Sequence, residues 1–150
     1  CISCLKEGRE EVTFFLNAKL KNWLLEEKKI MIPYNSAITN KEFNTQNLFM
    51  LIKTKINPAL IKLRNDINKE KVLNVDLKRI AKAYIEKLDS LMEALSQVEI
   101  GLKDNKTALL NIGRNGLSKY REMQLSFIKI IKVLLKDYSI ELNGGFEYGN

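Results

Sequence analysis

The residues of this chain best suited to chemistry are its two cysteines, Cys1 and Cys4, which have the spacing C-x-x-C. Two thiols at this spacing are typical of redox-active disulfides and of one half of a zinc site. A redox pair normally begins a helix that follows a strand, and a zinc site needs four ligands, yet the chain contains no histidine. Redox or metal chemistry at Cys1 and Cys4 is therefore the weakest interpretation of this pair.

The lack of histidine also removes Ser-His and Cys-His nucleophile pairs, His-ligated haem and Glu-x-x-His di-iron sites. The acidic residues Glu86, Asp89 and Glu93 lie among lysines, off the apolar stripe of their helix. We expect exposed charge pairs there rather than an acid–base couple. The stretches "GRNG" and "NGG" lack the strand that precedes a phosphate-binding loop. We therefore expect no catalytic residue, no metal and no cofactor.

Cys1-Ile2-Ser3 resembles the start of a mature bacterial lipoprotein, whose signal peptide is cut immediately before a lipid-bearing cysteine. The resemblance covers this terminus alone. It implies a lipid on Cys1 and a place in the bacterial cell envelope, anchored to a membrane outside the cytoplasm, either periplasmic or at the surface. A second alignment ends the signal at "ISC" and makes Cys4 the acylated residue. An arbitrary chain boundary at Cys1 is the remaining interpretation.

The composition is that of one globular domain, since 45% of the 150 residues are hydrophobic and 29% are charged. The net charge of +7 is spread along the chain, and no long run of like charges marks an interaction tail. Apolar runs such as Leu48–Ile52 are far shorter than the roughly 20 residues of a membrane span. Trp23, Tyr84, Tyr120 and Phe127 fit core positions, so we expect no nucleic-acid partner.

Apolar residues recur at three- and four-residue steps along four segments, which is the pattern of amphipathic helices. The clearest stripe contains Leu77, Ala81, Tyr84, Leu88, Leu91, Leu95, Val98 and Leu102. The other predicted helices span about 10–29, 39–67 and 106–142. Short links make consecutive helices neighbours, so the sequence predicts an all-α fold, an antiparallel four-helix bundle.

The second predicted helix should begin at the capping box Thr39–Glu42. Pro58 should either kink this helix or break it briefly, and in the second case Asn57 caps a new helix whose first residue is Pro58. The preceding stretch Ile30–Ile38 contains Pro33 and is predicted to be a packed connection between helices.

The last predicted helix has Gly113 and Gln124 at stripe positions, which suggests an interruption near "NIGRNG". The predicted organisation is a tether over 1–9, a helical bundle over 10–142 and a flexible tail over 143–150.

Two surface features are candidate contact sites. The first helix has a second apolar face, which consists of Phe14, Ala18 and Leu25. We favour burial of this face beneath Ile30–Ile38, and the alternative is a contact with a partner or with a second copy of the chain. The last helix has a basic side, which consists of Arg121, Lys129, Lys132 and Lys136. We favour a solvated surface there, and the alternative is a contact with an anionic surface.

The expected function is that of a membrane-anchored bacterial lipoprotein that acts as a non-catalytic protein-interaction module, with an unidentified protein partner. The alternative is an untethered helical adaptor or small-ligand carrier with a cavity between its helices. A carrier predicts a continuous apolar cavity of a few hundred Å³, whereas a tightly filled core would exclude one.

Overall fold

The computed structural model describes residues 7–40 and 44–142, and within these ranges it contains helices and no strand. The elements, in chain order, are α1 (Arg9–Phe14), η2 (Phe15–Leu20), α2 (Lys21–Thr39), α3 (Thr45–Leu51), η3 (Ile52–Ile56), α4 (Asn57–Asn68), α5 (Val75–Asp104) and α6 (Thr107–Asp137). Here η marks a π-helical segment. The elements α1, η2 and α2 form one continuous helical unit, and α3, η3 and α4 form a second. With α5 and α6 there are four units, so the predicted all-α helical bundle is confirmed.

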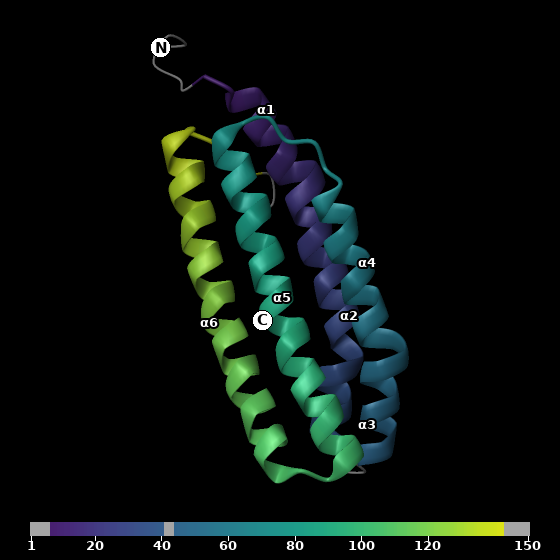
Figure 1. The fold of residues 1–150 in the computed structure, drawn as a ribbon. Coiled ribbons are helices and arrows are strands. Elements are labelled where there is room, and N and C mark those ends of the chain that lie inside the picture. The colour runs from purple at the N-terminus through teal and green to yellow at the C-terminus, as the bar shows by residue number, and fades with distance from the viewer. Residues whose placement is uncertain (1–6, 41–43, 143–150) are drawn as a thin grey trace.

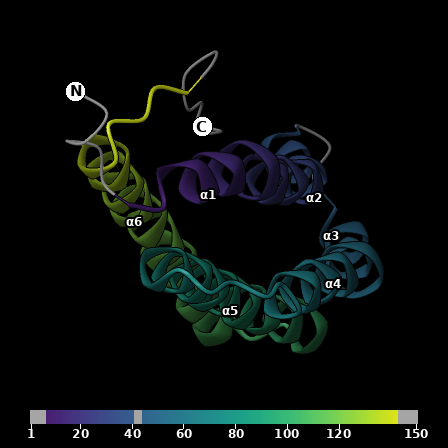
Figure 2. The same cartoon turned by 90° about the horizontal axis from the view of Figure 1, so that it is seen from above.

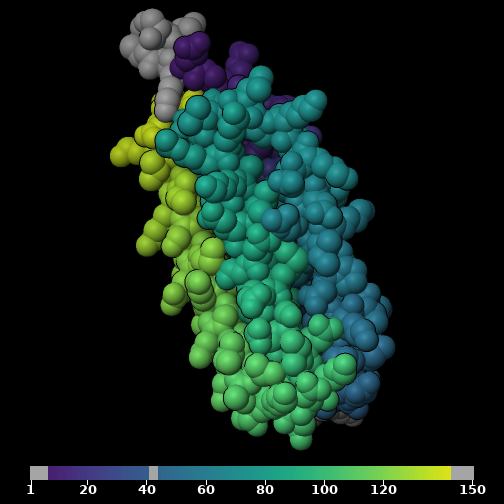
Figure 3. Space-filling model, viewed as in Figure 1, coloured from purple at the N-terminus to yellow at the C-terminus, as the bar shows by residue number. Residues whose placement is uncertain are grey.

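The four helical units lie side by side in an elongated molecule (Figure 1). Seen along the bundle, the α1–α2 unit, the α3–α4 unit, α5 and α6 follow one another around a shared core (Figure 2). On the face drawn in Figure 3, α5 lies between α6 and α4. Close backbone approach is most extensive between α5 and α6, and it is sparse between α2 and α6. None of the described helices is both long and apolar enough to cross a membrane.

The predicted connection at Ile30–Ile38 is wrong, because α2 continues as a helix to Thr39 with Pro33 inside it. Proline removes one backbone donor from a helix, but Tyr34 next to it is buried and anchors this turn in the core. The predicted helix start at Thr39 is also wrong, since Thr39 is the last residue of α2. The helix α3 begins instead after Asn44, whose side chain accepts a hydrogen bond from the Asn47 backbone N–H at 3.1 Å.

The predicted irregularity near Pro58 takes the form of the π-helical segment η3, which ends immediately before α4. A proline ring collides with the carbonyl four residues earlier in an α-helix, and a wider π-helical turn relieves that collision. Asn57 has helical backbone angles, with φ −58° and ψ −47°, so its predicted role as a helix cap is wrong. The other π-helical segment, η2, which comes earlier in the chain, was not predicted.

Small residues allow α5 and α6 to approach closely. A Cβ on Gly113 would lie 2.5 Å from Val98 Cγ2, and one on Gly116 would lie 2.8 Å from Ala94 Cβ. The helix α6 is not interrupted near "NIGRNG". The glycine at a stripe position is therefore a point of close helix packing and not a break.

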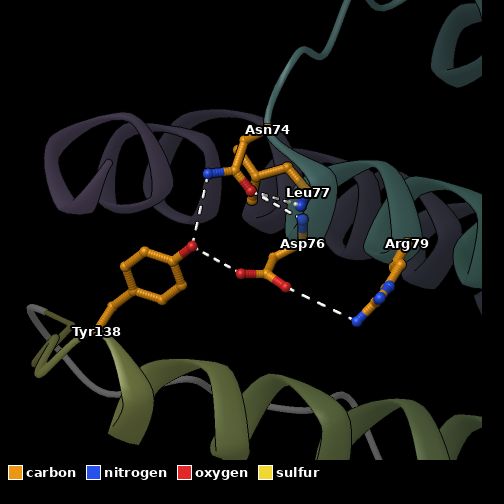
Figure 4. A network of polar contacts seen from close by, with 5 residues as sticks. All are labelled: Asn74, Asp76, Leu77, Arg79 and Tyr138. Atoms are coloured by element: carbon orange, nitrogen blue, oxygen red, sulfur yellow. Dashed lines mark hydrogen bonds and ion pairs between the residues drawn. The ribbon is translucent and has the colours of Figure 1, made fainter. Parts of the chain in front are cut away.

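A polar cluster joins the start of α5 to Tyr138, the residue that follows α6 (Figure 4). Asn74 caps α5, because its Oδ1 accepts hydrogen bonds from the backbone N–H groups of Asp76 and Leu77 at 2.9 and 3.2 Å. The Tyr138 hydroxyl donates to Asp76 Oδ2 at 2.7 Å, and Asp76 also forms an ion pair with Arg79. These contacts hold the end of α6 against α5.

Candidate binding groove

A groove of about 540 Å³ lies between α2 and α6, where the two helices do not pack closely. Its walls carry six apolar side chains, which are Leu24, Met31, Ile32, Leu117, Leu125 and Ile128. Three exposed cationic residues also line it, which are Lys28, Arg121 and Lys132. The groove therefore combines an apolar interior with a positively charged edge.

The floor of the groove is formed by Glu27, Tyr120 and Gln124, which belong to a polar cluster that joins three helices. Glu27 of α2 is 5% exposed, and its Oε1 accepts a hydrogen bond from Lys87 Nζ of α5 at 2.7 Å. Its Oε2 accepts a hydrogen bond from the Tyr120 hydroxyl of α6. Lys87 Nζ also donates to Oε1 of Gln124, again from α6, at 2.5 Å. Both carboxylate oxygens and the ammonium group are thus partnered, and the cluster ties α2 to α5 and α6.

Aromatic rings surround the Lys87 ammonium group. Its Nζ lies 4.0 Å from the ring centre of Tyr84 and 5.4 Å from that of Phe127, distances at which a cation is attracted to a ring face. Tyr84 and Phe127 also pack edge to face, as do Trp23 and Tyr84 and, further along, Phe15 and Trp23. The charged cluster is therefore enclosed in the most aromatic part of the core.

This enclosure shifts the protonation of the buried groups. Burial lowers the pKa of Lys87, and the neighbouring Glu27 carboxylate opposes that shift. Burial also raises the pKa of Tyr84 and Tyr120, and in both cases the Glu27 carboxylate raises it further. Both phenols consequently keep their protons at neutral pH, so Tyr120 can donate to Glu27.

Two buried polar atoms in the described residues have no hydrogen-bond partner, the Tyr84 hydroxyl and Asn57 Oδ1. The Tyr84 hydroxyl lies near Glu27 without a hydrogen bond of normal geometry. Leaving a buried hydroxyl unpaired costs about 1–3 kcal/mol. Neither residue lines the groove, so these atoms bear on stability rather than on a ligand.

A smaller hollow of about 350 Å³ lies between α5 and α6, and Lys87 lines this hollow rather than the groove. Its lining mixes charges of both signs, Glu86 and Glu122 with Lys119, so it has no net electrostatic preference. The groove between α2 and α6 is therefore the better candidate site, because it is larger and the exposed charged residues at its edge are all cationic.

The predicted burial of the second apolar face of the first helix is wrong. Phe14 is 64% exposed, Leu25 is 50% exposed, and Ala18 is also exposed. The stretch that was expected to cover them, Ile30–Ile38, instead extends the same helix. Phe14, Ala18 and Leu25 lie outside the groove lining.

The structure places the predicted basic residues on the exposed surface of α6, but it divides them. Arg121 and Lys132 line the groove, whereas Lys129 and Lys136 do not. The predicted exposure of Glu86, Asp89 and Glu93 is confirmed. Asp89 pairs with Arg64 of α4 at 2.5 Å, an ion pair between helices rather than within one. Cys1 and Cys4 lie outside the described residues.

Sequence reasoning missed Glu27 and Lys87, although a signal for each was present. Ile80, Tyr84, Lys87, Leu91 and Ala94 recur at three- and four-residue steps and are all buried. Glu27 likewise follows Leu20 and Trp23 at core spacing. A charged residue inside each of two apolar stripes indicates a buried ion pair. The polar Gln124, in the stripe of α6, is the third residue of this cluster.

No family model, curated protein or solved structure matches this chain. Among the residues that the structure describes, no three His, Cys, Asp or Glu side chains come together to hold a metal ion.

Proposed function

We propose that this chain is a non-catalytic binding module that holds the apolar part of a ligand in the groove between α2 and α6. The observation that carries this proposal is the groove itself. Its volume of about 540 Å³ lies within the range of roughly 300–1,000 Å³ that small-molecule sites occupy. Its six apolar wall residues provide the kind of surface that holds the apolar part of a ligand in such sites.

The polar floor supports binding rather than catalysis. The ammonium group of Lys87 and both oxygens of Glu27 are engaged with each other and with α6 side chains. A general acid or base must exchange a proton with a substrate, and these groups are committed to one another. The same contacts fix the separation of α2 and α6, which pre-organises the groove and lowers the entropic cost of binding.

The neutral fluorescent probe N-phenyl-1-naphthylamine tests this function, because its emission rises in an apolar site. We expect saturable binding to the wild-type chain. Replacing two exposed wall residues, Ile32→Glu with Leu125→Glu, should weaken binding at least tenfold, about 1.4 kcal/mol. The matched control is Leu73→Glu with Val133→Glu, which changes two exposed apolar residues outside the groove. Equal loss in both double variants, or no binding to the wild-type chain, would overturn the proposal.

We also propose attachment to a bacterial envelope membrane through Cys1, on the sequence resemblance alone. The test is metabolic labelling with an alkyne fatty acid in cells that express the full natural gene. Labelling that is lost in Cys1→Ser and kept in Cys4→Ser is expected. Labelling that follows Cys4 instead would support the second alignment, and an unlabelled wild-type protein would exclude the anchor.

A protein contact is a second candidate function, favoured by the exposure of Phe14, Ala18 and Leu25 on one helical unit. Exposed apolar residues that gather on one face mark interaction sites. A second copy of the chain is the first partner to test, by sedimentation equilibrium of the wild type and of Phe14→Ser with Leu25→Ser. Dimers lost in this variant support the contact, and monomers at all concentrations exclude the homodimer.

A further inference from the structure

One end of the groove gathers groups that have hydrogen-bond donors suited to an anion. Tyr34 and Asn35 of α2 line this end together with Arg121 of α6. The Tyr34 ring is buried, and burial raises the pKa of its hydroxyl, while the guanidinium groups of Arg121 and Arg114 act in the opposite direction. The hydroxyl thus lies within the field of two arginines and keeps its proton at neutral pH, as a donor must.

The positive charge at this end has no acidic counterpart in the groove. Glu27 is the one acidic residue in the groove lining, and Lys87 and Tyr120 already occupy its two carboxylate oxygens. None of the ion pairs among the described residues involves Arg114 or Arg121. The groove therefore complements a ligand that brings its own negative charge to this end.

From this end the groove lining continues along both helices, and its apolar side chains are interspersed with Glu27, Lys28 and Gln124. On α2 it runs from Asn35 back to Leu24, about 16 Å at the 1.5 Å rise per residue of a helix. On α6 it runs from Leu117 past Arg121 to Lys132, and its apolar side chains beyond Arg121 are Leu125 and Ile128. A ligand that matches this layout has one anionic group and a single extended apolar chain.

We propose that the groove binds a fatty acid, with its carboxylate held by Arg121, the Tyr34 hydroxyl and the Asn35 amide, and its acyl chain along Met31, Leu24 and Ile128. This inference rests on the proposed function. An arginine and a phenol suit a carboxylate, because guanidinium binds both of its oxygens side by side and the phenol adds a third donor. The six apolar wall residues supply the burial of the chain.

The test is displacement of N-phenyl-1-naphthylamine from the full chain by dodecanoate and by dodecanol, which share a chain length and differ in the headgroup. We expect dodecanoate to bind at least tenfold more tightly than dodecanol. Arg121→Met should abolish that preference. The matched control Lys129→Met removes an exposed cation of the same helix outside the groove, and it should keep the preference.

The outcomes separate this inference from the proposed function. If the probe does not bind the wild-type chain, the groove function itself fails. If the probe binds but acid and alcohol displace it equally, the groove function stands and the fatty acid is overturned. Tighter binding of dodecyl phosphate or of an acidic amphipathic peptide than of dodecanoate would also overturn it. A preference that survives Arg121→Met would overturn the assigned carboxylate site.

Discussion

Lys87 Nζ lies 2.7 Å from Glu27 Oε1, and this contact joins the centre of α5 to the centre of α2 with both side chains almost completely buried. Two charges taken from water into a protein core lose much of their hydration, and their attraction roughly compensates for that loss. The pair therefore contributes little net stability, but removing one member leaves the other uncompensated. In this protein Glu27 of the pair also forms part of the floor of the groove.

Removing one charge of this pair should be costly. We expect Lys87→Met to lower the free energy of unfolding by about 3–5 kcal/mol, because the Glu27 carboxylate stays buried without its partner. The double variant Lys87→Met with Glu27→Leu should recover most of that loss. Urea unfolding followed by circular dichroism measures both, with the exposed Lys129→Met as a control near zero. A double variant less stable than Lys87→Met would contradict the interpretation.

Stability should decrease at alkaline pH. Tyr34, Tyr84 and Tyr120 have raised pKa values in the folded state, chiefly from burial, so above pH 10 the unfolded chain releases protons that the folded chain keeps. Each such tyrosine lowers the free energy of unfolding by up to about 1.4 kcal/mol per pH unit in that range. Lys87 has the opposite effect on stability. Its pKa is lowered in the folded state, so below pH 10.5 the folded chain releases this proton before the unfolded chain does, and the free energy of unfolding rises with pH.

Tyr84→Phe isolates one part of this effect. The variant should be as stable as the wild type or more stable at pH 7, because the hydroxyl that it removes has no hydrogen-bond partner. It should also lose stability less steeply above pH 10. Urea midpoints measured from pH 7 to pH 11 give both quantities, and a variant destabilised at pH 7 would show that the hydroxyl is bonded after all.

The close contact of α5 and α6 makes a direct prediction for Gly113. Replacing a glycine inside a helix with alanine ordinarily stabilises the helix by about 1 kcal/mol. Here the new Cβ would lie 2.5 Å from Val98 Cγ2 and 3.1 Å from the Ala94 carbonyl oxygen, so Gly113→Ala should destabilise by about 1–3 kcal/mol. Thermal unfolding checks the sign. Ser118→Ala, at an exposed position of the same helix, should show no loss.

The sequence was sufficient to predict the helical bundle, because its apolar stripes are long. Each residue of the stripe from Leu77 to Leu102 is buried or packs against the core. Pro33 misled the prediction because local propensity disfavours proline in a helix, whereas burial of the neighbouring Tyr34 keeps that turn helical. Tertiary packing overrode the local signal at this position.

The groove could not be predicted from one sequence, since it depends on which helices stay apart. Arg121 and Lys132 were recognised as part of a basic side, but nothing in the spacing of α6 shows that α2 lies opposite them. Glu27 and Lys87 are 60 residues apart in the chain, so only the fold brings them together. The sequence shows a charged residue at core spacing in α2 and another in α5, but it does not show that the two residues pair.

The measurement that tests the groove most directly is methyl NMR of the ¹³C-labelled full chain during titration with dodecanoate. Saturable shifts are predicted at the wall methyl groups of Leu24, Leu125 and Ile128, with Val133 on the outer side of α6 unchanged. Shifts centred on Leu25, or no saturable shift at any methyl group, would contradict the account.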